Sequence, residues 1–559
     1  MKFLPKTPAG FAAAGLLLLL LFLFLLLPPV PARLDPGPWA DLAARTVAGA
    51  YHVHSARSDG AADKPAIAAA AAAAGLRFLI LTDHGDATRP PDPPIYINGV
   101  LCLDAVEIST DEGHYVALDM PRAPYPLGGA AADVVEDVAR LGGFGIAAHP
   151  DSEKAALRWT DEDAPIDGIE WLNGDSEWRD ESRRTLWRVG ASYFFRPGPA
   201  LALVLDRPTT LDRWDRLASS RPIVAIAGLD AHGGIGRRAE DGSLSGVLGV
   251  PSYKASFQAF SNRIVLERPW SGDAAADARA LWAAIRSGRV YTTVDAVAAP
   301  GLLDFHAKTK PGGTTPQLVP MGGILPEGAS ATLVARALKP AGAQIVLVHD
   351  GRDIAASSGE LRQTITQGKG AYRIEVRVLG APGDPPVPWI VSNPIYFLAP
   401  RPPAIQMPPN GGETTRITPD RWHIEKDRAS SAVLRTGSGE VEFQYTLGMG
   451  DRASQYAALA AELPREPFRQ VAMKLAANRP MRVSLQLRDT EGRRWGRSAY
   501  IPPDGRELLV PLGEFRPIAN SAFAPDPRTL KSVLVVVDLT NSSPGSSGTL
   551  HLRCSELVK

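Results

Sequence analysis

Two histidines and an aspartate lie close together near the start of the chain, in the sequence His52-Val53-His54-Ser55-Ala56-Arg57-Ser58-Asp59-Gly60. Side chains two residues apart in an extended strand point to the same face, so His52 and His54 can reach one metal ion while Val53 points into packing. Such a triplet also occurs by chance at polar strand ends. Whether it binds metal therefore depends on what the rest of the chain places beside it.

Short apolar runs alternate with helix-like segments, such as the alanine-rich 66–74, from about residue 45 to residue 300. This alternation predicts an α/β fold with a parallel sheet, and closure into a barrel would bring the C-terminal ends of the strands to one rim. Polar residues follow the apolar runs and are expected on that rim. They are His52, His54, Asp59, His84, Glu107, His114, His149, Asp230 and His232.

The motifs that contain these residues resemble a known signature. They are His52-Val53-His54 with Ser58-Asp59-Gly60, Thr82-Asp83-His84-Gly85, Glu107 with Gly113-His114, His149-Pro150, and Gly228-Leu229-Asp230-Ala231-His232. Together they resemble the four motifs of the polymerase and histidinol phosphatase (PHP) family of metal-dependent phosphoesterases. The resemblance covers about residues 45–300 and implies a distorted (β/α)7 barrel that holds up to three divalent metal ions.

The resemblance also implies how the ligands are shared. It assigns His52, His54, Glu107 and Asp230, which would form the catalytic set, to one ion. It assigns Glu107, His114 and His149 to a second ion, and Asp59, His84 and His232 to a third. Zn, Mn and Fe all suit such nitrogen and oxygen ligands. Three carboxylates do not neutralise three divalent ions, so a phosphate group would complement the remaining positive charge.

Three other residues are candidates for contact with the substrate. Arg57 and Arg237 lie in predicted loops on the rim, where a guanidinium group could bind a phosphoryl oxygen, although a solvated loop arginine is the ordinary alternative. Glu170 ends another predicted strand and is expected to line the pocket.

Residues 1–32 are predicted to form a transmembrane anchor or signal segment. An uncharged apolar run from Phe11 to Leu27 follows Lys2 and Lys6, and it has the minimum length of a membrane-spanning helix. Val30-Pro31-Ala32 is a poor cleavage site, which favours an uncleaved anchor. We therefore expect the soluble part to lie outside the cytoplasm, in the periplasm or extracellular space.

The rest of the chain is predicted to be rich in β-strands. Residues 301–400 are typical of a small β-sandwich, 401–414 of a proline-rich linker, and 415–559 of a jelly-roll-like module that could bind carbohydrate. The chain has 60 Lys+Arg and 60 Asp+Glu, so bulk binding of nucleic acid is not expected. Its two cysteines, Cys102 and Cys554, do not form a disulfide framework or a thiolate zinc site.

The sequence thus predicts an exported, membrane-anchored phosphoesterase. Metal-bound hydroxide in a multinuclear centre would hydrolyse the phosphate ester of a phosphorylated small molecule. Two alternatives are open. One is a cell-surface protein that binds glycan or a partner and keeps metal for stability, and the other is a metal-dependent hydrolase of another bond.

Overall fold

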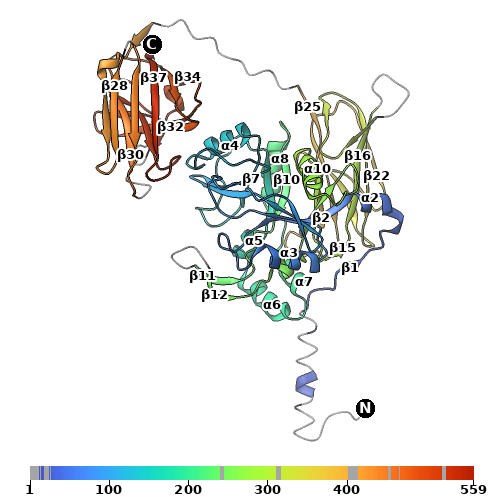
Figure 1. Cartoon of the computed structure of the whole chain (residues 1–559). Helices are drawn as coiled ribbons and strands as arrows, with labels where there is room; N and C mark the ends of the chain where they lie inside the picture. Colours follow the sequence, from blue (N-terminus) through green and yellow to red (C-terminus); the bar gives the residue numbers. More distant parts are fainter. Residues whose placement is uncertain are drawn as a thin grey trace, which may run out of the picture. The chain divides into compact units, whose positions relative to one another are not determined.

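The computed structural model describes residues 12, 14–17, 24, 27–238, 244–309, 317–400, 413–437, 439–450, 455–464, 466–518 and 524–559. The chain divides into two compact units (Figure 1). Unit 1 comprises residues 1–85, 91–121 and 138–401, and unit 2 comprises 86–90, 122–137 and 402–559. The expected mixed α/β N-terminal region and all-β C-terminal region are both confirmed.

Eight strands of unit 1 form a closed path with seven positions, because β5 and β6 follow each other at one position. β2, β3 and β5 pair in parallel, β6 continues from β5, β7 is antiparallel to both β6 and β8, and β9 and β10 continue in parallel with β8. The amide of Leu229 donates to the carbonyl of Tyr51 (3.0 Å), which returns the path from β10 to β2. The bounds are β2 (Thr46–Val53), β3 (Phe78–Leu81), β5 (Val100–Asp104), β6 (Val106–Thr110), β7 (Gly113–Leu118), β8 (Phe144–Ala147), β9 (Gly168–Asn173) and β10 (Val224–Gly228).

Helices connect these strands. The predicted alanine-rich helix begins where Asp63 caps the amide of Ala66, and it buries Ile67 and Ala71. The described helices are α2 (Ala40–Ala44), α3 (Lys64–Ala73), α4 (Ala131–Arg140), α5 (Gly174–Arg179), α6 (Arg183–Tyr193), α7 (Pro197–Leu201), α8 (Thr210–Ala218), α9 (Tyr253–Phe257) and α10 (Ala274–Arg286), with 3-10 turns η1 (Gly37–Trp39) and η2 (Ala202–Val204).

The side chains of two buried asparagines form hydrogen bonds with backbone amides and carbonyls of β10. Asn393 Oδ1 accepts from the amide of Ala225 (2.8 Å), and its Nδ2 donates to the carbonyl of the same residue (2.8 Å). Asn262 makes the same pair of bonds with Ala227 (3.0 and 2.8 Å). A side-chain amide thus replaces a strand partner at two positions, because buried backbone polar groups require partners.

Residues 301–400 do not form a compact unit of their own, so the boundary expected at residue 300 does not divide the structure. β24 (Ile390–Ser392) pairs with β14 (Val290–Thr293), which makes one 12-stranded sheet from strands on both sides of that boundary. Arg373 on β23 (Gly370–Arg377) also donates to both carboxylate oxygens of Asp215 on α8 (2.8 Å each).

The remaining strands of unit 1 have the following bounds. They are β1 (Ala32–Arg33), β4 (Ile95–Ile97), β11 (Ile235–Arg238), β12 (Leu244–Leu248), β13 (Ser261–Val265), β14 (Val290–Thr293), β15 (Ala298–Ala299), β16 (Leu302–Thr309), β17 (Gln317–Pro320), β18 (Ile324–Pro326), β19 (Ala331–Leu338), β20 (Gln344–His349), β21 (Arg352–Ser357), β22 (Leu361–Ile365), β23 (Gly370–Arg377), β24 (Ile390–Ser392) and β25 (Ile395–Leu398).

Unit 2 is a sandwich of two six-stranded sheets that share one hydrophobic core. Phe443 and Leu475 enter this core from one sheet, and Val483 and Val535 enter it from the other. The strands are β26 (Thr414–Arg416), β27 (Trp422–Lys426), β28 (Ser431–Thr436), β29 (Val441–Thr446), β30 (Tyr456–Glu462), β31 (Gln470–Ala477), β32 (Met481–Asp489), β33 (Arg494–Ile501), β34 (Arg506–Pro511), β35 (Arg516–Ile518), β36 (Leu530–Asp538) and β37 (Ser547–Val558), with 3-10 turns η3 (Pro419–Arg421) and η4 (Leu512–Glu514).

Most of the apolar run 11–27 and the proline-rich 401–412 lie outside the described residues. Among the residues that are described, no helix is both long enough and apolar enough to cross a membrane.

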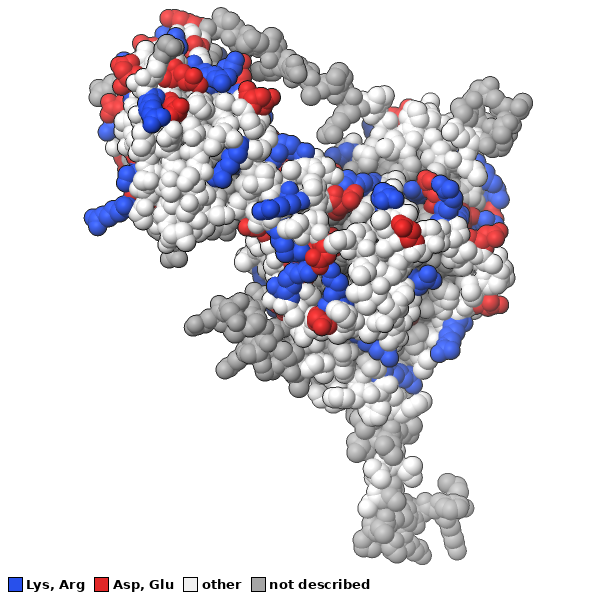
Figure 2. Space-filling view, viewed as in Figure 1, with Lys and Arg blue, Asp and Glu red and all other residues white. Residues whose placement is uncertain are grey.

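Basic and acidic side chains are interspersed on the face of the molecule that Figure 2 shows. Positively and negatively charged side chains are therefore mixed on that face rather than grouped by sign.

Candidate metal centre

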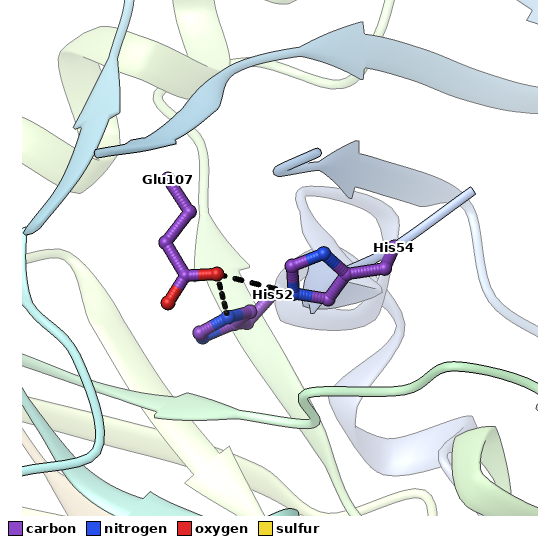
Figure 3. Close-up of side chains that lie close together, drawn as sticks. All are labelled: His52, His54 and Glu107. Atoms are coloured by element: carbon purple, nitrogen blue, oxygen red, sulfur yellow. Dashed lines mark ion pairs between the residues drawn. The ribbon is translucent and has the colours of Figure 1, made fainter. Parts of the chain in front are cut away.

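The end of β2 carries the first two predicted ligands. The pairing of β2 with β3 shifts register between Ala50 and Val53, and His52 has a φ of 61°. The two imidazoles reach one carboxylate oxygen of Glu107 through this irregularity (Figure 3), where the sequence predicted a regular strand. His149 (φ 30°) and Asp230 (φ 48°) also have positive φ values. Such backbone conformations are costly for residues other than glycine and gather at functional sites.

Four predicted ligands converge at separations that suit one ion. Oε2 of Glu107 lies 3.3 Å from Nε2 of both His52 and His54. Oδ1 of Asp230 lies 3.5 and 3.3 Å from the same two nitrogens. A tetrahedral site with metal–ligand bonds of about 2.0–2.1 Å has ligand–ligand separations of about 3.3 Å.

Hydrogen bonding does not explain this convergence. His52 Nε2, His54 Nε2, His84 Nδ1 and Glu107 Oε2 are buried and have no hydrogen-bond partner among the described residues. Buried polar atoms are seldom left in this way, because each would lose its hydration without compensation. The donor set therefore fits a bound cation.

A second group surrounds Asp59. Oδ2 of Asp59 lies 3.3 Å from His232 Nε2 and 3.5 Å from His84 Nε2. Each of these two separations suits a pair of ligands of one ion, and both imidazoles are partly exposed. The triads that could hold an ion join Asp59 and His84 with His54, and His232 with His54 and Asp230. The residues assigned to the third ion by the resemblance therefore lie together.

Glu107 connects the groups. Its Oε1 atom lies 2.7 Å from His149 Nε2 and 2.8 Å from His114 Nδ1. Its Oε2 atom faces His52 and His54, and also His84 Nδ1 at 3.2 Å. All nine predicted ligands thus belong to one continuous cluster whose triads could hold metal ions.

The environment keeps the carboxylates ionised. Burial alone would raise the pKa of Glu107, but the imidazoles around it, led by His52, hold this pKa well below its ordinary value. The pKa of Asp230 is lowered in the same way, against the effect of burial. Conversely, the carboxylates around His52, led by Glu170, raise the pKa of this imidazole although burial opposes it. Coordination needs unprotonated imidazole, so a cation competes with protons for these nitrogens.

Glu170 lies behind the ligands and does not line the pocket as predicted. It is fully buried, and its Oε1 lies 2.5 Å from His52 Nδ1. Its Oε2 accepts from the amide of His149 and from Asn173 Nδ2 (2.8 Å each). A Cβ atom at Gly228 would lie 2.3 Å from Glu170 Oε1, so the glycine makes room for this carboxylate. Glu170 thus orients the imidazole of His52 and holds the main chain at His149.

A cavity of about 550 Å³ opens over the cluster. Asp59, Glu107 and Asp230 reach it from the metal-ligand side. Two cationic residues that the sequence did not single out, Lys154 and Arg179, also line it. The remaining wall is largely apolar and includes Trp178, Leu201, Val204, Leu205 and Phe260.

The two arginines predicted to contact substrate are placed differently. Arg57 is not part of the cavity wall, and its guanidinium group is paired with Asp92 (2.6 Å) and Asp104 (3.0 Å). Arg237 lies in β11, where side chains fall outside the described part of the structure. Lys154 and Arg179 were missed because they lie in no motif.

No family model and no curated protein matches this chain. The family 11 carbohydrate-binding module of a cellulosomal cellulase of Clostridium thermocellum is similar at 13% identity and a TM-score of 0.22, over 27% of this chain and 96% of the module. An exo-beta-agarase is 12% identical with a TM-score of 0.18, over 25% of this chain and 24% of the agarase. A family 29 carbohydrate-binding module is 8% identical with a TM-score of 0.19, over 26% of this chain and 91% of that module.

Proposed function

We propose that unit 1 is a metal-dependent phosphoesterase with a PHP-like barrel. The position of Glu107 is the observation that carries the proposal, because its two oxygens face different sets of imidazoles. One carboxylate between two ligand sets favours a multinuclear centre over a single structural ion. The closed strand path and the order of the motifs along the chain give further support.

Divalent ions held by this cluster would supply Lewis-acid polarisation of the phosphoryl oxygens and of the attacking water. Lys154 and Arg179 line the same cavity and can bind the phosphoryl oxygens by charge-assisted hydrogen bonds. Asp175 accepts from Arg179 Nη2 (2.9 Å) and orients its guanidinium group. The apolar wall of Leu201, Leu205 and Phe260 would hold the organic part of the ester and exclude water.

We also propose that the apolar run from Phe11 to Leu27 anchors the chain and that the units lie outside the cytoplasm. The length of this run and the lysines before it support the proposal. A reporter enzyme fused after Lys559 that is active only in the cytoplasm should remain inactive. An active fusion would contradict this orientation.

The hydrolase proposal is tested with the full chain in detergent. Metal content is measured by plasma emission, and turnover is measured on nucleotides, sugar phosphates, phosphodiesters, carboxylic esters and amides. Hydrolysis of phosphoesters is expected. Hydrolysis of esters or amides alone would favour another metal-dependent hydrolase, and full metal content without any turnover would favour a binding protein.

Carbohydrate binding by unit 2 is a second candidate. Among the aromatic residues that suggested it, Trp495 is buried in the core, whereas Tyr456 and Tyr500 are only partly buried. Isothermal titration of the full chain with soluble glucans tests this candidate. A Tyr500→Ala variant should lose the binding if this ring contacts sugar.

A further inference from the structure

Three large aromatic side chains are exposed at and beyond α6. Trp187, Phe194 and Phe195 retain 58%, 83% and 66% of their accessible surface. Trp187 and Phe194 are seven residues apart, so they share one side of the helix and its C-terminal continuation. Exposed aromatic surface of this kind is typical of an interaction site.

Basic residues accompany the aromatic ones. Arg183 and Arg184 are exposed in the first turn of α6, and the helix contains no Asp or Glu. Trp and Phe combined with Arg are characteristic of helices that lie in the interface of a membrane. An anionic lipid surface would complement both properties.

This surface lies where the chain leaves its apolar run. Arg196, next to Phe195, donates a hydrogen bond to the carbonyl of Pro28, which directly follows the run from Phe11 to Leu27. Figure 1 shows α6 and α7 at the same end of unit 1 as β1, which begins at Ala32. If residues 11–27 span a membrane, the aromatic surface is therefore held close to it.

The helices behind this surface also form the cavity wall. α6 packs on α7 and η2, and these two elements supply Leu201 and Val204 to the cavity. The elements α7 and η2 thus contact both the helix that carries Trp187 and the cavity over the metal ligands.

We propose that Trp187, Phe194 and Phe195 enter the boundary between lipid headgroups and acyl chains, and that Arg183 and Arg184 contact anionic headgroups. The occupant of this surface is the lipid bilayer that holds the N-terminal run. The inference rests on the proposed anchor and uses none of the metal ligands, so it does not depend on the chemistry of the cavity.

Spin labels on the full chain in vesicles test this proposal. One label is placed by Phe195→Cys and a matched control by Leu318→Cys, in a Cys554→Ser background where Cys102 remains buried. Leu318 is also an exposed apolar residue (60%). It lies on β17, whose partner β16 is at the other end of unit 1 from α6 (Figure 1).

In vesicles of phosphatidylcholine with phosphatidylglycerol, the label at 195 should be several-fold less accessible to a water-soluble nickel chelate than the label at 318, and more accessible to oxygen. Equal accessibility at both positions would overturn the proposal. Shielding of position 195 from both reagents would also overturn it, because it would indicate contact with protein. If the label at 195 lies equally deep in vesicles of phosphatidylcholine alone, the proposed role of Arg183 and Arg184 would be overturned.

Discussion

His52 Nδ1 lies 2.5 Å from Oε1 of Glu170, and both side chains are fully buried. Glu170 uses its other oxygen to accept two N–H groups, so Oε1 is the acceptor for the Nδ1 proton of His52. That proton position leaves Nε2 of His52 as the free nitrogen, directed at Glu107. The carboxylate therefore selects the imidazole tautomer that can bind a metal.

Glu170→Gln should weaken metal binding. The amide oxygen of glutamine is needed by the two donors at Oε2, so its NH₂ group would face His52 Nδ1. The proton of His52 then moves to Nε2, which can no longer bind a cation. We expect a loss of roughly 10–100-fold in metal affinity, measured by competition with a chelator. Glu491→Gln, at an exposed glutamate, is the matched control, and equal affinity in the two variants would contradict the tautomer argument.

Glu107→Gln should have a larger effect than any single imidazole substitution. The change removes the negative charge that faces both ligand sets and leaves one acceptor oxygen in place of two. Plasma emission should show the loss of at least one ion, and most turnover should be lost with it. His114→Ala, which affects one side only, should keep partial metal content. A Glu107→Gln protein that keeps its full metal content and its turnover would show that another residue connects the two ligand sets.

Asn393→Ala should destabilise unit 1. It leaves the amide and the carbonyl of Ala225, both buried, without the partner described above. Each unsatisfied group costs about 1–3 kcal/mol, so a loss of roughly 3 kcal/mol is expected in the free energy of unfolding. Urea denaturation measures this loss. Gln317→Ala, at an exposed amide, should be nearly neutral.

The buried pair of Glu375 and Arg373 predicts a loss of stability in acid. Burial alone would raise the pKa of Glu375, but the guanidinium groups of Arg373, Arg207 and Arg377 lower it from 4.5 to about 2. A lowered pKa means that the stabilisation is complete above about pH 4.5 and is lost as the pH falls towards 2. The shift corresponds to about 3 kcal/mol. Denaturation of Glu375→Gln across this range should depend less on pH, and an unchanged pH dependence would refute the assignment.

The candidate ligands could be predicted because they occur in short motifs at the ends of apolar runs, as His84 and His149 do. The role of Glu170 could not be predicted, because its position at the end of a strand does not show whether the side chain faces the cavity or lies behind the ligands. Lys154 and Arg179 reach the cavity from segments without a motif.

The extent of unit 1 could not be predicted from the sequence either. β14 pairs with β24 across a long stretch of chain, and no local pattern around residue 300 signals that pairing. The register shift in β2 is another such case. Strand alternation correctly placed His52 and His54 near each other, but the positive φ of His52 produces their convergence.

The positive φ values of His52, His149 and Asp230 have a consequence for how the site is loaded. This unfavourable conformation belongs to the main chain, and it is maintained by surrounding strand pairs whose hydrogen bonds do not involve an ion. The ligands therefore form a rigid template, and cation uptake needs no folding step. Exchange of ions should then be limited by the breaking of metal–ligand bonds, and filling the centre should slow the exchange of amide hydrogens in β2 and β10 only as far as it stabilises the folded chain.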